Sequence, residues 1–153
     1  MSALSTSARN NNNVIRHPAA APEDALMLLA RARNAAFAEA ARGNLGQGLG
    51  ILQNAMEDEP ASHELQADMA ALLLVAGRLD QACQCAERAL QIQPDHGPSL
   101  YTLGFALSGL GRSQRAIEIL TRLQAGPGRD SLLQEAPDLL PVAMQELERL
   151  SRR

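Results

Sequence analysis

The sequence predicts an all-α fold built from stacked helix-turn-helix units, and three observations carry that prediction. Ala and Leu dominate the apolar positions of the 153-residue chain, while only Phe37, Tyr101 and Phe105 are aromatic. Such a composition suits helices, because strands favour the β-branched and aromatic residues that are scarce here. Gly43, Gly77 and Gly111 recur at a constant 34-residue interval, and apolar residues follow helical spacing on both sides of each glycine.

The 34-residue spacing divides the chain into three windows, residues 29–62, 63–96 and 97–130. Each window is predicted to be a helix, a glycine-centred turn and a second helix. The glycine can adopt the left-handed conformation that closes the first helix. Pro60 and Pro94 are separated by the same interval and are expected to stop the second helices of their windows.

Small residues recur at one column of the aligned windows. Gly48, Ala82 and Ala116 occupy the same position in the second helix of each window, and Gly104 lies in the first helix of the third. Side chains this small let two helices approach closely. The column explains why the core is rich in alanine.

Two flanking segments complete the prediction. Residues 1–22 have no acidic side chain and are rich in Asn, Ser and Ala, so we expect a disordered tail ahead of a domain over residues 23–153. Pro22 stands where the first helix is expected to begin. At the other end, Asp138 is a candidate N-cap for an amphipathic capping helix over about residues 138–152.

The pattern resembles the tetratricopeptide repeat family, whose units have this length and these small-residue, glycine and proline positions. The third window carries the resemblance in Leu100, Leu103, Gly104, Leu107, Gly111, Ala116 and Leu120. The resemblance implies three repeats in a right-handed superhelical stack with a concave groove, covered by a capping helix. In architecture it is similar to the small chaperones of bacterial type III secretion. It specifies a fold and not a function.

Composition and charge exclude several classes of function. The net charge is −3, the pI is about 5.6 and there is no Lys, so nucleic acid is not an expected partner. Residues 1–22 lack the apolar stretch that a secretory signal needs, and the longest apolar run, Met69–Ala76, is too short for a membrane span, which favours a cytoplasmic protein without a membrane partner. Cys83 and Cys85 point apart on a helix, and His63 with His96 lacks a ligand set. We therefore expect no metal, no cofactor and no enzymatic activity.

The aromatic residues point to a candidate binding surface. Tyr101 and Phe105 share a helix face well away from the buried leucine stripe, and Phe37 occupies the column of Phe105. In a fold similar to the tetratricopeptide family this column faces the concave groove. We predict a partner-binding site formed by Arg33, Phe37, Leu74, Tyr101 and Phe105. The alternative is that the rings pack against a flanking segment as part of the core.

The family's carboxylate clamp is largely missing. That clamp uses Lys, Asn and Arg on the first helices of the repeats, and only Arg33 is suitably placed here. Phe37, Asp68, Pro98 and Thr102 occupy the other positions. Binding of chaperone C-termini through this clamp is therefore not expected.

The leading functional hypothesis is a small adaptor or chaperone that holds a peptide segment of another protein in an apolar groove. The alternative is a structural subunit that self-associates, as a homo-oligomer, or assembles into a larger complex.

Overall fold

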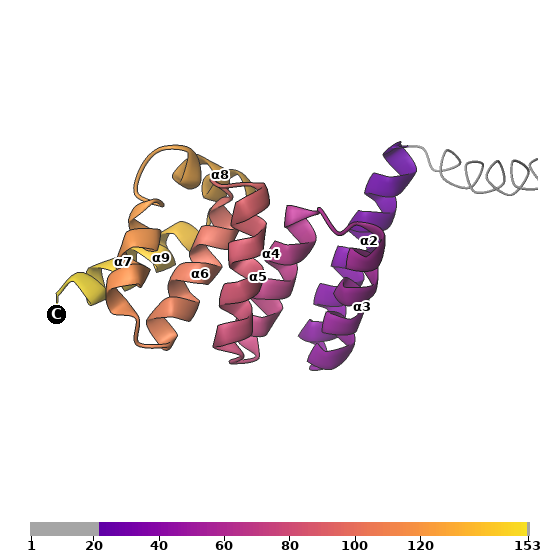
Figure 1. The fold of residues 1–153 in the computed structure, drawn as a ribbon, viewed down its shortest axis with the longest axis horizontal. Coiled ribbons are helices and arrows are strands. Elements are labelled where there is room, and N and C mark those ends of the chain that lie inside the picture. The colour runs from indigo at the N-terminus through magenta and orange to yellow at the C-terminus, as the bar shows by residue number, and fades with distance from the viewer. Residues whose placement is uncertain (1–21, 153) are drawn as a thin grey trace, which may run out of the picture.

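The computed structural model describes residues 22–152, which form eight helices and no strand (Figure 1). The helices are α2 (Pro22–Ala41), α3 (Leu45–Asp58), α4 (His63–Val75), α5 (Leu79–Ile92), α6 (Gly97–Gly109), α7 (Ser113–Thr121), α8 (Pro127–Glu135) and α9 (Leu139–Ser151). The all-α prediction is confirmed. The predicted tail over residues 1–22 lies outside the described residues, apart from Pro22, where α2 begins.

The turns between paired helices have the predicted glycine geometry. Gly43, Gly77 and Gly111 adopt φ values of 89°, 76° and 77°, a region that only glycine enters without steric cost. In the second of these turns the Arg78 N–H donates to the Leu73 carbonyl at 2.9 Å. This bond satisfies a carbonyl that the end of α4 would otherwise leave unpaired.

Close approach between paired helices explains the small residues. A Cβ on Gly48 would lie 2.6 Å from the Ala36 carbonyl oxygen, and a Cβ on Gly104 would lie 2.3 Å from Leu120 Cδ2. Ala82, at the position of Gly48 in the next pair, is fully buried. The backbones of α2 and α3 therefore meet where the sequence has no side chain.

The segment after α7 contains a helix that the sequence did not predict. The positive φ of 83° falls on Gly126 rather than on Gly128, and Pro127 opens α8 immediately afterwards. Gly128 lies inside α8, where a Cβ would be 2.7 Å from the Arg122 carbonyl oxygen. Gly128, which follows Pro94 by 34 residues, is thus a close-contact glycine inside a helix and not part of a turn.

The helix predicted over residues 138–152 corresponds to α9. Asp138 occupies the N-cap position, as predicted, although its side chain makes no capping hydrogen bond. Both α8 and α9 pack on α6, and α9 also packs on α7. Together they cover the C-terminal end of the stack.

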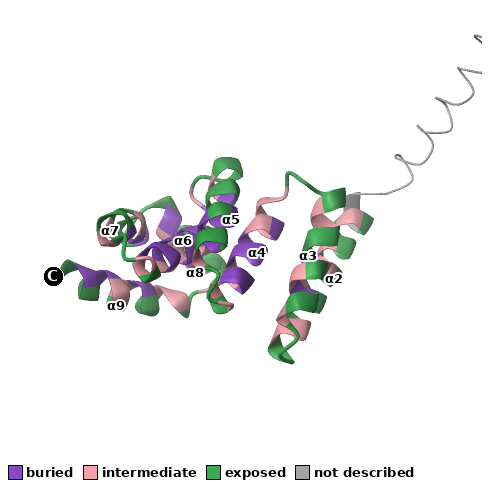
Figure 2. Cartoon of the chain, turned by 60° about the horizontal axis from the view of Figure 1, so that its bottom comes forward, coloured by how far each residue is buried: buried purple, intermediate pink, exposed green. Residues whose placement is uncertain are grey.

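The core follows the stack and is densest in its middle and C-terminal parts (Figure 2). The largest fully buried apolar side chains are all leucines: Leu52, Leu65, Leu100, Leu103, Leu120, Leu123 and Leu132. Helix α6 touches α4, α5, α7, α8 and α9. It therefore forms the centre around which the other helices are arranged.

Candidate functional site

A groove of about 480 Å³ runs across α2, α4, α6 and the start of α9. We call it the inner groove and define it by its lining residues: Arg33, Phe37, Ala67, Asp68, Ala71, Leu74, Val75, His96, Pro98, Tyr101, Thr102, Glu135, Ala136 and Leu139. Its walls come from the first helix of each of three successive pairs, with one end closed by the segment between α8 and α9. A segment of another chain would therefore contact several helices at once.

Four of the five predicted site residues line this groove. Arg33 and Phe37 come from α2, Leu74 from α4 and Tyr101 from α6. Phe105 lies one turn further along α6, and its ring centroid is 4.6 Å from that of Tyr101. The Phe37 side chain is 40% exposed, which leaves an aromatic surface facing solvent.

Arg33 is engaged within the chain. Its guanidinium donates through Nε and Nη2 to the two carboxylate oxygens of Asp68, and through Nη1 to Glu64 Oε2 at 2.7 Å. Burial raises the pKa of Asp68, and the hydrogen bonds from Arg33 offset part of that rise. Arg33 thus joins α2 to α4, and its guanidinium is already hydrogen-bonded to two carboxylates.

A buried polar cluster anchors α8 to the start of α6. His96 Nδ1 lies 2.7 Å from Ser99 Oγ, and His96 Nε2 lies 3.1 Å from a carboxylate oxygen of Glu135. The Gly97 N–H donates to Ser131 Oγ at 2.8 Å. Burial lowers the pKa of His96 despite the attraction of Glu135, so the imidazole is neutral at pH 7.

Ser99, His96 and Glu135 are the residue types of a hydrolytic triad. They can act as a triad only if a substrate reaches the Ser99 hydroxyl. Ser99 is fully buried, and its hydroxyl contacts a histidine one turn away at the start of the same helix. No substrate carbonyl can reach that oxygen. The cluster holds α8 in place, and residues 22–152 contain no group of three or more His, Cys, Asp or Glu side chains able to bind a metal ion.

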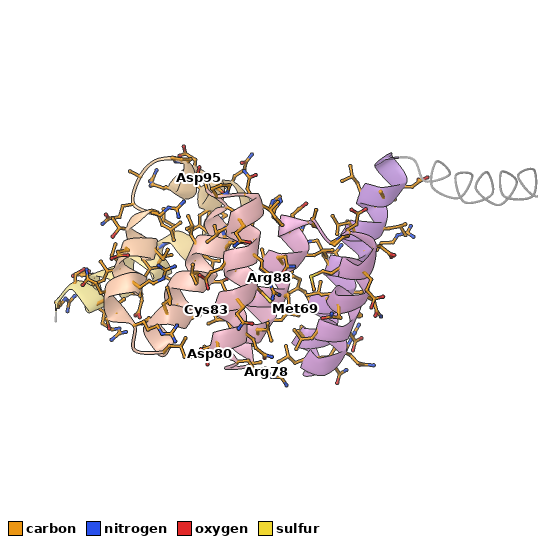
Figure 3. The ribbon with its side chains drawn as sticks, viewed as in Figure 1. Met69, Arg78, Asp80, Cys83, Arg88 and Asp95 are labelled. Atoms are coloured by element: carbon orange, nitrogen blue, oxygen red, sulfur yellow. The ribbon has the colours of Figure 1, made fainter. Side chains whose placement is uncertain are left out.

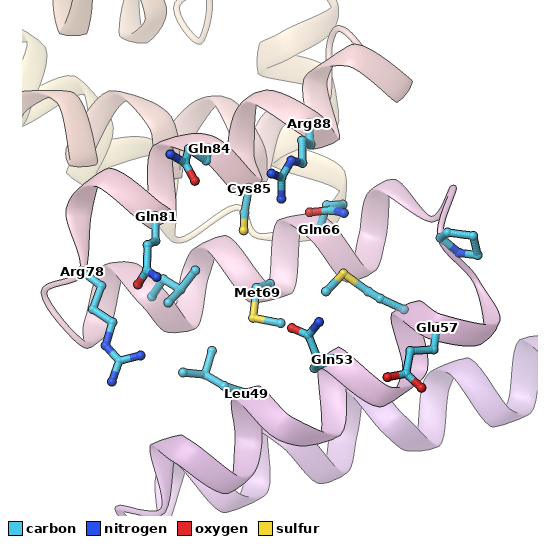
Figure 4. A pocket seen from close by; sticks show the side chains of 13 residues that line it. Leu49, Gln53, Glu57, Gln66, Met69, Arg78, Gln81, Gln84, Cys85 and Arg88 are labelled. Carbon is cyan, nitrogen blue, oxygen red and sulfur yellow. The ribbon is translucent and has the colours of Figure 1, made fainter.

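A second cavity, of about 490 Å³, separates α3 from α5 on the other side of α4 (Figure 4). Leu49 and Gln53 reach it from α3, and Met69 and Gln66 from α4. The Gln66 Oε1 atom is buried without a hydrogen-bond partner. Arg88 closes the α5 side. This cavity marks a loose junction between the first helix pair and the second.

The two cysteines are free, in agreement with their predicted placement on opposite sides of a helix. Cys83 is labelled on α5 in Figure 3, and Cys85 faces the second cavity in Figure 4. Burial raises the pKa of both thiols. A buried thiol with a raised pKa is a poor nucleophile, so neither is a candidate reactive group.

Sequence reasoning missed the groove residues that come from outside the repeat windows. Glu135, Ala136 and Leu139 follow the last repeat window, from the end of α8 to the start of α9, and they line the groove because α8 packs on α6. Val75 was also missed, although it is 80% exposed at the end of α4. A large apolar residue just before a turn glycine was the available signal for Val75.

The family model of the tetratricopeptide repeat matches residues 85–118. The matched segment runs from the middle of α5 through α6 into α7, which is the best-packed part of the stack. The chain thus contains a tetratricopeptide repeat, and the resemblance read from the glycine and alanine spacing is confirmed. Among curated proteins, no sequence relative matches the chain.

Solved structures with the same fold include three tetratricopeptide repeat domains. The second such domain of human RPAP3, in complex with the HSP70 peptide SGPTIEEVD, has a TM-score of 0.65 at 16% identity, over 84% of this chain and 99% of that chain. The TPR2B domain of yeast Sti1, in complex with pHsp70, has a TM-score of 0.69 at 13% identity, over 82% of this chain and 98% of that chain. The Sgt2 TPR domain from Aspergillus fumigatus has a TM-score of 0.63 at 20% identity, over 87% of this chain and 84% of that chain. At these identities the likeness shows the fold alone.

A helix crosses a bilayer only if it is both long and predominantly apolar. Within residues 22–152, no helix meets both conditions.

Proposed function

We propose that this protein is a small adaptor or chaperone that holds a peptide segment of another protein in the inner groove. The single observation that carries the proposal is the convergence of Phe37, Leu74 and Tyr101, from three different helices, on one groove. Aromatic and leucine side chains on a preformed surface bind with little loss of conformational entropy. A non-enzymatic, cytoplasmic interaction module without nucleic-acid or membrane partners is the corresponding proposal for the whole chain.

The solved structures of similar fold support the proposal by analogy. Human RPAP3 and yeast Sti1 domains are described in complexes with HSP70 or HSP90 peptides. A domain of this fold can therefore bind a short peptide. The ligand itself does not carry over, because Arg33 is paired with two carboxylates and the other clamp positions hold Phe37, Asp68, Pro98 and Thr102.

The experiment begins with a phage-displayed library of random dodecapeptides selected on the full chain. A synthetic copy of an enriched peptide is then titrated by fluorescence anisotropy. Phe37→Ala should weaken binding about tenfold, since an aromatic anchor at an interface is worth more than about 1 kcal/mol. Ile92→Ala is the matched control, because Ile92 is as exposed as Phe37 (42% against 40%) and lies outside the groove.

Equal affinities of the wild type and Phe37→Ala would refute the groove as the binding site. Hydrogen exchange with the peptide bound gives an independent check, because protection should map to α2, α4 and α6. Protection confined to α5, α7 or α9 would also refute the groove as the binding site.

A structural subunit that self-associates is the second candidate function, and one feature favours it. Leu26, Met27 and Leu28 are 65%, 55% and 62% exposed on the first turns of α2, at the open end of the stack. An apolar patch at an uncovered repeat is a candidate contact surface. Sedimentation equilibrium at increasing concentration tests it: a monomer throughout would exclude self-association, and Met27→Ser should abolish any dimer observed.

A further inference from the structure

The inner groove carries an unbalanced negative charge. Among residues 22–152, Arg33 is the one cationic residue that lines it, whereas Asp68 and Glu135 line it and Glu64 borders it through its bond to Arg33. One cation against three carboxylates leaves an excess of two negative charges. His96 adds no positive charge at pH 7, because its burial lowers the imidazole pKa.

The hydrogen bonds show which of these charges is available to a ligand. The guanidinium of Arg33 directs its bonds to Asp68 and Glu64, so it offers an incoming carboxylate little. Glu135 faces a neutral imidazole, and its side chain is 41% exposed. Glu135 is therefore an accessible carboxylate that contacts His96, and the charge of Arg33 acts on it only at longer range.

Apolar side chains line the groove together with this carboxylate. They include Tyr101 and Leu139, and Phe37 and Val75 add exposed apolar surface. Aromatic faces attract guanidinium and ammonium groups as well as apolar side chains. A surface of rings and carboxylates is complementary to a segment in which apolar and basic residues alternate.

We infer that the occupant of the inner groove is a basic, apolar segment of a partner protein, with Arg or Lys opposite Glu135 and apolar side chains against Phe37, Leu74 and Tyr101. The inference rests on the proposed function and names the class of its ligand. Acidic segments such as SRMEEVD, the HSP90 peptide in the solved complex of the first Spaghetti (RPAP3) domain, are rejected. Like charges across an interface suppress binding.

The test uses the composition of the selected peptides together with charge-changing variants. Enriched dodecapeptides should carry an excess of Arg and Lys over Asp and Glu, and a copy with Glu at each basic position should lose binding. SRMEEVD serves as the acidic probe and should not bind. Raising the salt concentration should weaken binding of the basic peptide, because dissolved ions screen the attraction between opposite charges near a surface.

Glu135→Gln should lower the affinity for the basic peptide about fivefold, because one ion pair in contact with water contributes about 1 kcal/mol. Glu87→Gln is the matched control, because Glu87 is an exposed carboxylate on α5 that pairs with Arg115 outside the groove. A thermal melt of each variant verifies that it is folded. Glu64→Gln gives a second measurement on a less exposed carboxylate, since the Glu64 side chain is 36% exposed against 41% for Glu135.

The double variant Glu64→Gln with Asp68→Asn sharpens the test, because it removes both partners of Arg33. The freed guanidinium should raise the affinity for SRMEEVD relative to the basic peptide. This reversal requires charge selection in the groove, since a general loss of fold would weaken both peptides.

The outcomes separate this inference from the proposed function. If no peptide binds in the groove, both are overturned. If peptides bind through Phe37 but the enriched set is acidic or neutral, or Glu135→Gln matches Glu87→Gln, only the basic character of the ligand is overturned. A basic enriched set whose affinity depends on Glu135 supports the inference.

Discussion

The first helix pair and the third are built from the same sequence pattern, yet they differ sharply in burial. In α3 only Gly48 and Leu52 are buried, whereas α6 buries eight of its residues. Figure 2 shows α2 and α3 largely exposed or half-buried, and α6 largely buried. The second cavity, lined by Leu49 and Gln53, separates α3 from α5, while α6 packs directly on α5.

The difference lies in neighbours and not in the helices themselves. Among the helices of residues 22–152, the α2–α3 pair has a neighbouring pair on one side only, so these helices leave one of its faces uncovered. The α6–α7 pair has α4 and α5 on one side and α8 and α9 on the other. In a repeat stack, stability comes from the interfaces between units as much as from each unit. We therefore expect the same kind of substitution to have different effects in the two regions.

The largest effect is expected for Leu132→Ala. Leu132 is fully buried on α8 and packs over the start of α6, so its truncation should lower the free energy of unfolding by about 3 kcal/mol. Leu28→Ala removes the same atoms from a side chain that is 62% exposed and should change stability by less than about 0.5 kcal/mol. Urea unfolding measures both, and equal losses would contradict the contrast between the two regions.

Gly97→Ala should have the next largest effect. A Cβ at this position would lie 2.3 Å from the backbone nitrogen of Leu132, and backbone cannot move aside as a side-chain tip can. We expect a loss of about 2 kcal/mol in the free energy of unfolding, typical of overpacking. A melting temperature unchanged from the wild type would show that α8 does not press on α6.

The same substitution in the first pair should have the opposite sign. Gly50 lies within α3, and a Cβ there would meet no atom within 4 Å. Gly50→Ala should raise the free energy of unfolding by about 0.7 kcal/mol, because alanine loses less backbone entropy in a helix. Gly48→Ala is the control on the buried face of α3, where the Ala36 carbonyl lies 2.6 Å from the new Cβ. It should destabilise the protein, and a gain at Gly48 would contradict the close approach of α2 and α3.

The smallest effect concerns pH and the anchor of α8. Burial lowers the pKa of His96, so as pH falls through about 6.5 the unfolded state takes up a proton before the native state does. The native state is therefore more stable, relative to the unfolded state, above that pH than below it. Chemical unfolding at pH 7.5 and 5.5 should show a larger loss for the wild type than for His96→Gln.

The comparison with His96→Gln isolates this histidine from other titrating groups. Burial raises the pKa of Asp68, so Asp68 contributes the opposite trend, with native stability increasing as pH falls through its pKa. That contribution is largely common to both proteins, because burial and Arg33 influence the Asp68 pKa more than His96 does. Parallel pH dependences of the wild type and His96→Gln would show that His96 does not link α8 to pH.

Much of the fold was predictable because it depends on local chemistry. A turn glycine needs a positive φ whatever surrounds it, so Gly43, Gly77 and Gly111 located three turns correctly. The small residue at Gly48 likewise indicated a close helix contact. Helix α8 was missed because Pro127 and Gly128 look like the residues of a turn. A helix of only nine residues is stable there because it packs on α6.

The candidate site was predictable in part for the same reason. Periodicity placed Tyr101 away from the main leucine stripe, and the repeat alignment put Phe37 in the column of Phe105; Tyr101 and Phe37 both line the inner groove. The pairing of Arg33 with Asp68 depends on side chains 35 residues apart, and no spacing rule within one helix reports it. The contribution of Glu135 depends on where α8 folds.

The sequence alone thus determined the helical units, their 34-residue length and the faces that carry their aromatic side chains, because all three follow from local backbone preferences and helical periodicity. Tertiary structure decided how firmly each unit is held and what charge its groove presents. Both depend on contacts between helices that are distant in sequence. The α8 segment illustrates this best: its packing on α6 buries His96, closes the groove and brings Glu135 to its edge.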